Sequence, residues 1–288
     1  MAKIGLDIGN ITTVAVSESR EIVIESRLAR ATEINKLGSE DVFTFDGVEY
    51  IANTGLFENN AVKHEKENFV ALMYYAIAKA TNSNKIQLVA GIPAGQYNSR
   101  RKDLEEFIRT NSTKTIVLDG ISRDITIDKV YVAPEGYALK VFNGITSKCI
   151  PGLKTLVVDI GGGTTDIAEF DENFRFTGGG SIKYGLLDLY REARMTINDT
   201  YNLNISLEES KKYFDGELSL INRDVTYKND LMKNCIKTIV NELRGLYPNL
   251  ANLNLILTGG GSSKVYPTFK NLYNQTILAE NIKSNAIG

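Results

Sequence analysis

The sequence has little of the residue types on which several common kinds of site depend. Its 288 residues include no tryptophan, one histidine and two cysteines. The single histidine, His64, lies among charged residues, which argues against histidine-based triads and proton relays. Cys149 and Cys235 are far apart in the chain and lack Cys-x-x-Cys spacing, so the sequence indicates neither a disulfide framework nor a zinc site.

Long apolar runs and a one-sided charge are also missing. No run reaches membrane-spanning length, and strand-like residues follow Met1-Ala2-Lys3 without an apolar leader, so we expect a cytoplasmic protein that does not bind membranes. A formal net charge of -2 argues against direct binding of nucleic acid, and a role on DNA would need an adaptor protein. The composition, 43% hydrophobic and 24% charged, is that of a globular protein, and the length suits two domains.

The most informative feature that is present is a motif that occurs twice. An apolar strand ends in aspartate at Asp7 and again at Asp159, and glycine and threonine follow each aspartate. Each copy predicts a strand, a tight turn and a returning strand. Glycine lets backbone N–H groups approach phosphate oxygens, threonine adds donors, and the aspartate can hold a hydrated divalent cation beside them.

Either copy alone could be an ordinary turn, because Asp-x-Gly is common in turns without a function. The repetition favours two like-folded domains around a cleft that binds a polyphosphate. We predict an α/β fold with a first domain over 1–147 and a second over 148–288. Small inserts are expected at about 30–62 and 194–228.

The rest of the chain alternates predicted strands and helices. An apolar stripe at helical spacing predicts a helix over 67–80, and Asp46-Gly47 predicts a hairpin turn in the first insert. The other expected strands are 3–7, 13–17, 21–27, 42–45, 48–52, 86–91, 114–118, 125–132 and 254–258. The other expected helices are 97–110, 181–193, 207–214, 229–246 and one from about Ser263.

Three further segments contain candidate site residues or unusual glycines. Pro134-Glu135 predicts a change from strand to helix, and Glu135 is then either a helix-dipole acid or a functional acid between the two repeats. The triplet 259–261 has more glycine than a plain strand-to-helix turn needs, which favours contact with a base or ribose. The triplet 178–180 is expected to precede the helix at Ser181.

Together these segments resemble five signatures of the actin, sugar kinase and heat-shock chaperone ATPase superfamily. The segments that match phosphate 1, connect 1, phosphate 2, adenosine and connect 2 are, in order, 7–13, 134–135, 159–166, 257–261 and 285–288. Within the superfamily, 45–52 and 88–97 resemble the bacterial and plasmid actins of the ParM type. The longer inserts and the membrane-binding segment usual in cell-shape actins of the MreB type are not evident.

The resemblance implies a duplicated actin-like (ribonuclease H-like) fold and filaments whose assembly is driven by ATP or GTP with Mg²⁺. It also implies plasmid DNA segregation through a DNA-binding adaptor protein. Asp7 and Asp159 would hold Mg²⁺ and its waters, and Glu135 would orient the attacking water. The expected nucleotide contacts are Gly9, Asn10, Thr12, Thr13, Gly161, Gly162, Gly163, Thr164, Gly259, Gly260 and Gly261. Glu209 and Lys212 would either flank the base and ribose or form a solvated helical pair.

Other functions on the same fold stay open at this point. A small-molecule, sugar-type kinase would need a base for a substrate hydroxyl, for which Asp166 is the candidate, and usually has larger inserts. An MreB-like cytoskeletal actin is the other alternative, whereas a chaperone would need a peptide-binding domain. Relatives usually continue past connect 2 into a helix that packs on the first domain, so we expect either a minimal member or a shortened chain.

Overall fold

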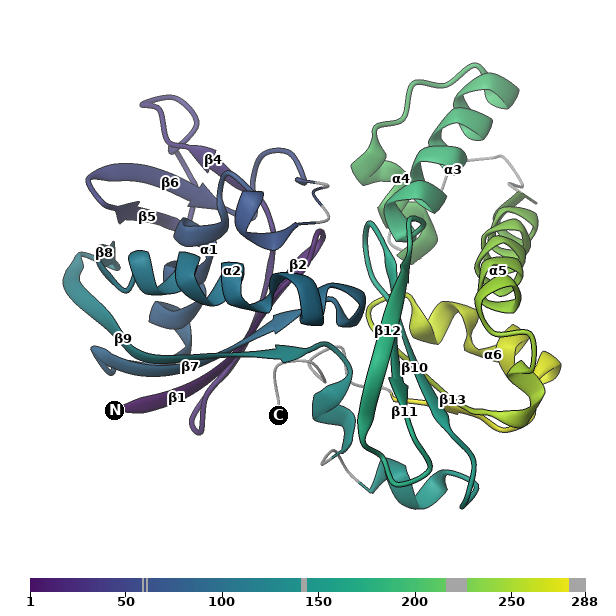
Figure 1. Ribbon diagram of the computed structural model, residues 1–288. Coiled ribbons are helices and arrows are strands. Elements are labelled where there is room, and N and C mark those ends of the chain that lie inside the picture. Colours follow the sequence, from purple (N-terminus) through teal and green to yellow (C-terminus); the bar gives the residue numbers. More distant parts are fainter. Residues whose placement is uncertain (59, 61, 141–143, 216–226, 280–288) are drawn as a thin grey trace.

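The molecule consists of two halves, each with its own β-sheet (Figure 1). The computed structural model describes residues 1–58, 60, 62–140, 144–215 and 227–279, and the backbone alone for 140 and 227–231. The expected connect 2 segment, 285–288, lies outside the described residues, as does the end of the expected second insert.

Within the described residues, the first sheet has nine strands and the second has five. The first has the order β3-β2-β1-β7-β9-β8-β5-β6-β4 and the second β12-β11-β10-β13-β14. The strands of the first sheet are β1 (Ala2–Ile8), β2 (Thr12–Val16), β3 (Glu21–Glu25), β4 (Leu28–Arg30), β5 (Val42–Phe45), β6 (Val48–Ala52), β7 (Lys85–Ile92), β8 (Thr113–Leu118) and β9 (Ile121–Pro134). Those of the second are β10 (Thr155–Ile160), β11 (Thr165–Phe170), β12 (Phe176–Ile182), β13 (Asn254–Thr258) and β14 (Thr276–Leu278).

The second sheet repeats the pairing of the first five strands of the first sheet. In both, a central strand (β1 or β10) pairs antiparallel with the next strand in the chain, and that strand pairs antiparallel with the third. On its other side the central strand is followed by two parallel neighbours, β7 and β9 or β13 and β14. The predicted duplicated α/β fold is therefore confirmed, and β8, β5, β6 and β4 extend the first copy.

Helices cover the sheets. The α-helices of the described chain are α1 (Phe69–Ala80), α2 (Tyr97–Thr110), α3 (Leu186–Tyr201), α4 (Leu207–Asp215), α5 (Tyr227–Leu246) and α6 (Ser262–Leu272). Short 3-10 helices are η1 (Lys63–Glu65), η2 (Ala94–Gln96), η3 (Tyr137–Lys140), η4 (Ile145–Lys148) and η5 (Leu250–Asn252). None of these described helices is both long enough and apolar enough to cross a membrane.

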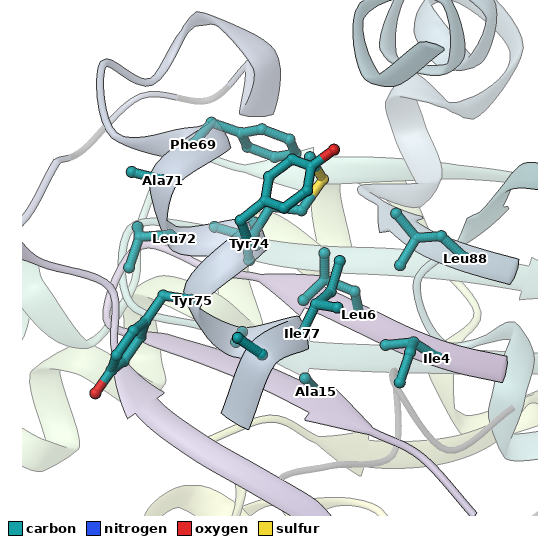
Figure 2. Close-up of a cluster of buried hydrophobic side chains, with 14 of the residues drawn as sticks. Ile4, Leu6, Ala15, Phe69, Ala71, Leu72, Tyr74, Tyr75, Ile77 and Leu88 are labelled. Carbon is teal, nitrogen blue, oxygen red and sulfur yellow. The ribbon is translucent and has the colours of Figure 1, made fainter. Parts of the chain in front are cut away.

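The core of the first half forms where α1 lies on the first sheet. Leu72 and Ile77 of α1 belong to one buried cluster with Ile4 and Leu6 of β1 and Leu88 of β7, and Figure 2 shows these side chains between helix and strands. In the second half every residue of β10 is buried, as expected for a central strand covered on both faces. Both aspartates of the repeated motif thus extend from strands that are held rigidly by packing.

The expected change from strand to helix after Pro134 occurs, but the helix is a short 3-10 helix that begins at Tyr137 and leaves Glu135 outside it. β9 continues to Pro134, and the backbone N–H of Glu135 donates to Ile92 O at 2.8 Å, which prolongs the pairing of β9 with β7. Gly136 then turns the chain with a φ of 82° into the short helix η3. Glu135 is therefore fixed at a strand end and is not a helix-dipole acid.

The expected helix after glycine triplet 178–180 is also misplaced. The triplet lies within β12, paired with β11, and the helix, α3, begins later at Leu186. The glycines make room for a contact between the two halves: a Cβ on Gly95 of η2 would lie 3.1 Å from the backbone of Gly180. η2 contacts β12, and Figure 1 shows the N-terminal end of α2, which follows η2, reaching β12.

Candidate functional site

An inner cavity lies where the two repeated hairpins meet. It is lined by residues of both halves, among them eleven that the sequence predicted as site residues. These are Asp7, Gly9, Asn10, Thr12, Glu135, Asp159, Gly161, Gly162, Thr164, Gly259 and Gly260. The strand order explains their proximity, because each hairpin follows the central strand of its own sheet.

The two hairpin turns have the same local structure. The N–H of Gly9 donates to Thr12 O at 2.9 Å, and the N–H of Gly161 donates to Thr164 O at 3.0 Å. A Cβ at Gly9 would lie 2.9 Å from that same oxygen, so the tight turn favours glycine. The equivalence supports the interpretation that both copies are phosphate-binding turns.

The turns also touch each other. Ile11, at the tip of the first hairpin, is only 9% exposed and packs in the core cluster of the second half. A Cβ on Gly162 would collide with the Ile11 side chain. Gly162 is therefore needed for the contact between the halves, in addition to any role toward phosphate.

Four carboxyl groups line the inner cavity, namely Asp7, Glu135, Asp159 and Asp166. All but Asp7 are less than a tenth exposed. Burial raises the pKa of Glu135, Lys63 lowers it, and the other three carboxylates raise it again, with a result of about 8. A group with a pKa in this range can exchange a proton near neutral pH, which suits a residue that orients or deprotonates water.

A lysine that the sequence analysis missed lies between two of these acids. Lys63 of η1 is 6% exposed, and its Nζ is 2.6 Å from Asp7 Oδ1 and 2.6 Å from Glu135 Oε1. Burial lowers the pKa of Lys63, but the two carboxylates outweigh burial and raise the pKa above its ordinary value. Lys63 is therefore an ammonium group inside the cavity.

A second buried lysine, Lys66, replaces helix N–H groups at the first hairpin. Its Nζ is 2.8 Å from Gly9 O and 3.4 Å from Ile8 O. In the second half the corresponding Gly161 carbonyl accepts from the N–H of Leu186 at the start of α3, at 3.0 Å. Burial, with repulsion from Lys63, lowers the pKa of Lys66 to about 7.

The donor set fits a metal that arrives with a nucleotide. Mg²⁺ is usually held by one or two carboxylates, with phosphate oxygens and water completing the octahedron. Asp7 and Asp159 offer such carboxylates beside glycine turns that can hold the phosphates. Over the described part of the chain, no three Asp, Glu, His or Cys side chains form a group that would hold a metal ion by themselves.

An outer cavity of about 210 Å³ adjoins the second hairpin. The two cavities share Ile11, Thr12, Gly161, Gly162 and Gly260. Leu186 and Tyr190 of α3 add apolar surface to the outer cavity, and Lys211, Asp215 and Lys264 add charge. Asp215 is 3.1 Å from Lys211 Nζ and 2.7 Å from Lys264 Nζ, so the three side chains hold one another in place.

The two candidates on α4 lie outside both cavities. Glu209 accepts from the N–H of Ser206 at 2.8 Å and thus caps its own helix. Lys212 pairs with Glu208 at 3.2 Å on the exposed face. The helix is placed as predicted, but its register turns Lys211 to the cavity in place of Lys212.

Three other predicted residues, Thr13, Gly163 and Gly261, do not line either cavity. Thr13 is fully buried, and its Oγ1 is 2.8 Å from Ser26 Oγ. Gly163 is buried and does not line either cavity. Gly261 caps α6, and a Cβ there would lie 2.6 Å from Ile160 Cγ2, so this glycine serves close packing. Their predicted contacts with nucleotide have no counterpart in the cavity lining.

The residues that sequence reasoning missed are Lys63, Lys66, Gln96 and Asn60, which line the inner cavity. Lys63 and Lys66 are three residues apart in a charged segment. From the sequence alone, such a segment is expected to be solvent-exposed surface. Their burial depends on η1 folding over the first hairpin. The only sequence signal was their position just before α1.

Comparison with known proteins agrees with this geometry. Residues 5–137 match the family described as actin-like proteins, N-terminal domain. No curated protein sequence matches the chain.

Solved structures match over almost the whole chain. An archaeal actin homolog, Ta0583, has a TM-score of 0.82 at 18% identity, covering 100% of this chain and 97% of its own. A non-polymerisable pCBH ParM mutant has a TM-score of 0.81 at 18% identity, covering 99% and 96%. The 15-stranded ParM filament from Clostridium botulinum has a TM-score of 0.76 at 17% identity, again covering 99% and 96%.

The fold is therefore that of the actin-like proteins, and the resemblance stated from the sequence motifs is confirmed. ParM structures are among the neighbours, as the resemblance to ParM-type actins predicted.

Proposed function

We propose that this actin-like protein binds a nucleoside triphosphate with Mg²⁺ in the cleft, hydrolyses it, and assembles into filaments. The observation that carries the proposal is the meeting of two equivalent Gly-Thr turns and their strand-end aspartates at one cavity. The Ta0583 structure in complex with ADP, with a TM-score of 0.82, supports nucleotide binding on this fold. The ParM filament structure supports self-association.

In this proposal the phosphates lie in the inner cavity and the base in the outer one. Backbone N–H groups of the turns at Gly9 and Gly161 would bind phosphate oxygens. Asp7 and Asp159 would hold the metal, which neutralises phosphate charge. The partly apolar outer cavity, which Lys211 and Lys264 also line, would hold the base.

Glu135 is the group that would act on the attacking water. It is buried at a strand end beside the cavity, and it needs only to orient the water and accept a proton, because phosphoryl transfer needs little covalent help from the protein. Glu135→Gln should retain nucleotide binding while phosphate release falls by about 10²-fold or more. An unchanged rate of phosphate release would remove Glu135 from the mechanism.

The biological role that we propose is segregation of plasmid DNA in the cytoplasm through a DNA-binding adaptor protein. A net charge of -2 gives no basis for direct contact with DNA. The test is light scattering and electron microscopy of the purified protein with ATP-Mg²⁺, GTP-Mg²⁺ and no nucleotide. Nucleotide-dependent filaments are expected; sugar-stimulated turnover without assembly would favour a kinase instead.

A further inference from the structure

The placement of Lys63 bears on how the cleft controls metal binding. Its ammonium contacts Asp7, a proposed metal ligand, and Glu135, the proposed water-orienting acid, each at 2.6 Å. Both contacts are inside the protein, since the Lys63 side chain is 6% exposed and that of Glu135 is 9% exposed. Lys63 thus occupies the side of Asp7 from which a cation would neutralise both acids.

The segment that holds Lys63 lies against α2. Its neighbours in η1 contact α2: the Glu65 carboxylate is 3.9 Å from Arg100, and the His64 ring lies 5.8 Å from the ring of Phe107. The Lys63 ammonium therefore reaches the two acids from a segment that packs on α2. A surface lysine, by contrast, would reach such acids only with a large loss of side-chain entropy.

We propose that Lys63 Nζ and the divalent metal are alternative cations for Asp7, so that Lys63 prevents the metal from binding until nucleotide is present. A monovalent and a divalent cation on the same carboxylate, inside a protein, repel each other strongly. Triphosphate oxygens supply the negative charge that would let both cations remain in the cavity. This inference rests on the proposed function, in which a nucleoside triphosphate brings the metal into the cavity.

The consequence concerns the order of binding. The empty site would be selective against free divalent ions and would accept the metal only as its nucleotide complex. Lys63 would also keep the buried acids neutralised while the site is empty, because an uncompensated buried charge is costly.

The test is titration of nucleotide-free protein with Mn²⁺, followed by electron paramagnetic resonance of the free ion. Lys63→Met should bind Mn²⁺ at least 10-fold more tightly than the wild type. Lys63→Arg, which keeps the positive charge, should resemble the wild type. The double variant Lys63→Met with Asp7→Asn should lose the gain. Lys63→Gln serves for the same comparison if the Met variant does not fold.

Equal Mn²⁺ affinity in wild type and Lys63→Met would overturn the inference, as would tight Mn²⁺ binding to the nucleotide-free wild type. The proposed function fails by a different result. Calorimetry showing that the wild type does not bind ATP-Mg²⁺ or GTP-Mg²⁺ would refute nucleotide binding and leave the Mn²⁺ comparison intact.

Discussion

The contact between η2 and β12 predicts opposite effects for two adjacent glycines. A Cβ at Gly179 would collide with Ile167 O on the paired strand and lie 2.8 Å from Ala94 Cβ in the other half. A Cβ at Gly178 would meet no atom within 4 Å. Gly179→Ala should therefore destabilise the protein, whereas Gly178→Ala should not.

The magnitudes follow from the two environments. Forcing a methyl group into a packed site costs about 1–3 kcal/mol, and here one of the atoms that must move is backbone. Replacing a strand glycine by alanine in open space is favourable by about 0.5–1 kcal/mol. Unfolding in urea should then separate the variants by about 1.5–4 kcal/mol, the sum of these two ranges. Equal urea midpoints for the two variants would refute the close contact between η2 and β12.

Three further predictions concern the site. Without nucleotide, Lys66 should make the free energy of unfolding rise with pH above 7, by at most about 1.4 kcal/mol per pH unit, because its pKa falls from 10.5 in the unfolded chain to about 7 in the fold and the unfolded state then binds more protons. Glu135, with its pKa raised to about 8, acts in the opposite direction up to about pH 8. The measurement is therefore the difference between wild type and Lys66→Met in urea titrations at pH 8 and 9: the wild type should gain stability relative to the variant, and parallel slopes would contradict the prediction. Lys211→Ala should weaken nucleotide affinity about 5- to 10-fold in calorimetry, the loss of roughly 1 kcal/mol from one polar contact, while the exposed Lys212→Ala should not, and equal effects would argue against the outer cavity as the base site. Gly162→Ala should weaken nucleotide binding and lower stability by about 1–3 kcal/mol, and the same substitution should cost less in an Ile11→Ala background, where the side chain that it contacts is shortened; an equal cost in both backgrounds would show that the two turns do not press on each other.

The fold could be predicted where the signal is local. The hairpin β5-β6 has the predicted bounds because Asp46 and Gly47 take φ values of 46° and 81°, which a two-residue turn of the mirror-image type requires. The helix 97–110 was also predicted with the bounds of α2, since its apolar and charged faces alternate at helical spacing. Strands β4, β12 and β14 were missed, because β4 and β14 have only three residues each and β12 contains a run of glycine, and neither gives a periodic signal.

The site could be predicted in part for the same reason. Within each of the two repeated turns the aspartate, glycine and threonine lie close together in sequence, so they were found together. Lys63 and Lys66 become site residues only through the path of η1 over the first hairpin, which no local pattern encodes. Lys211 and Lys212 are adjacent on α4 and point about 100° apart around the helix axis. Which of them faces the outer cavity is decided by how α4 packs on α3.

The seating of Ile11 in the opposite core limits how the molecule can flex. Withdrawing this side chain would expose apolar surface worth about 1.5–3 kcal/mol, so separation at the hairpin tips is disfavoured. The Gly95–Gly180 approach is a second place at which the two halves are held together.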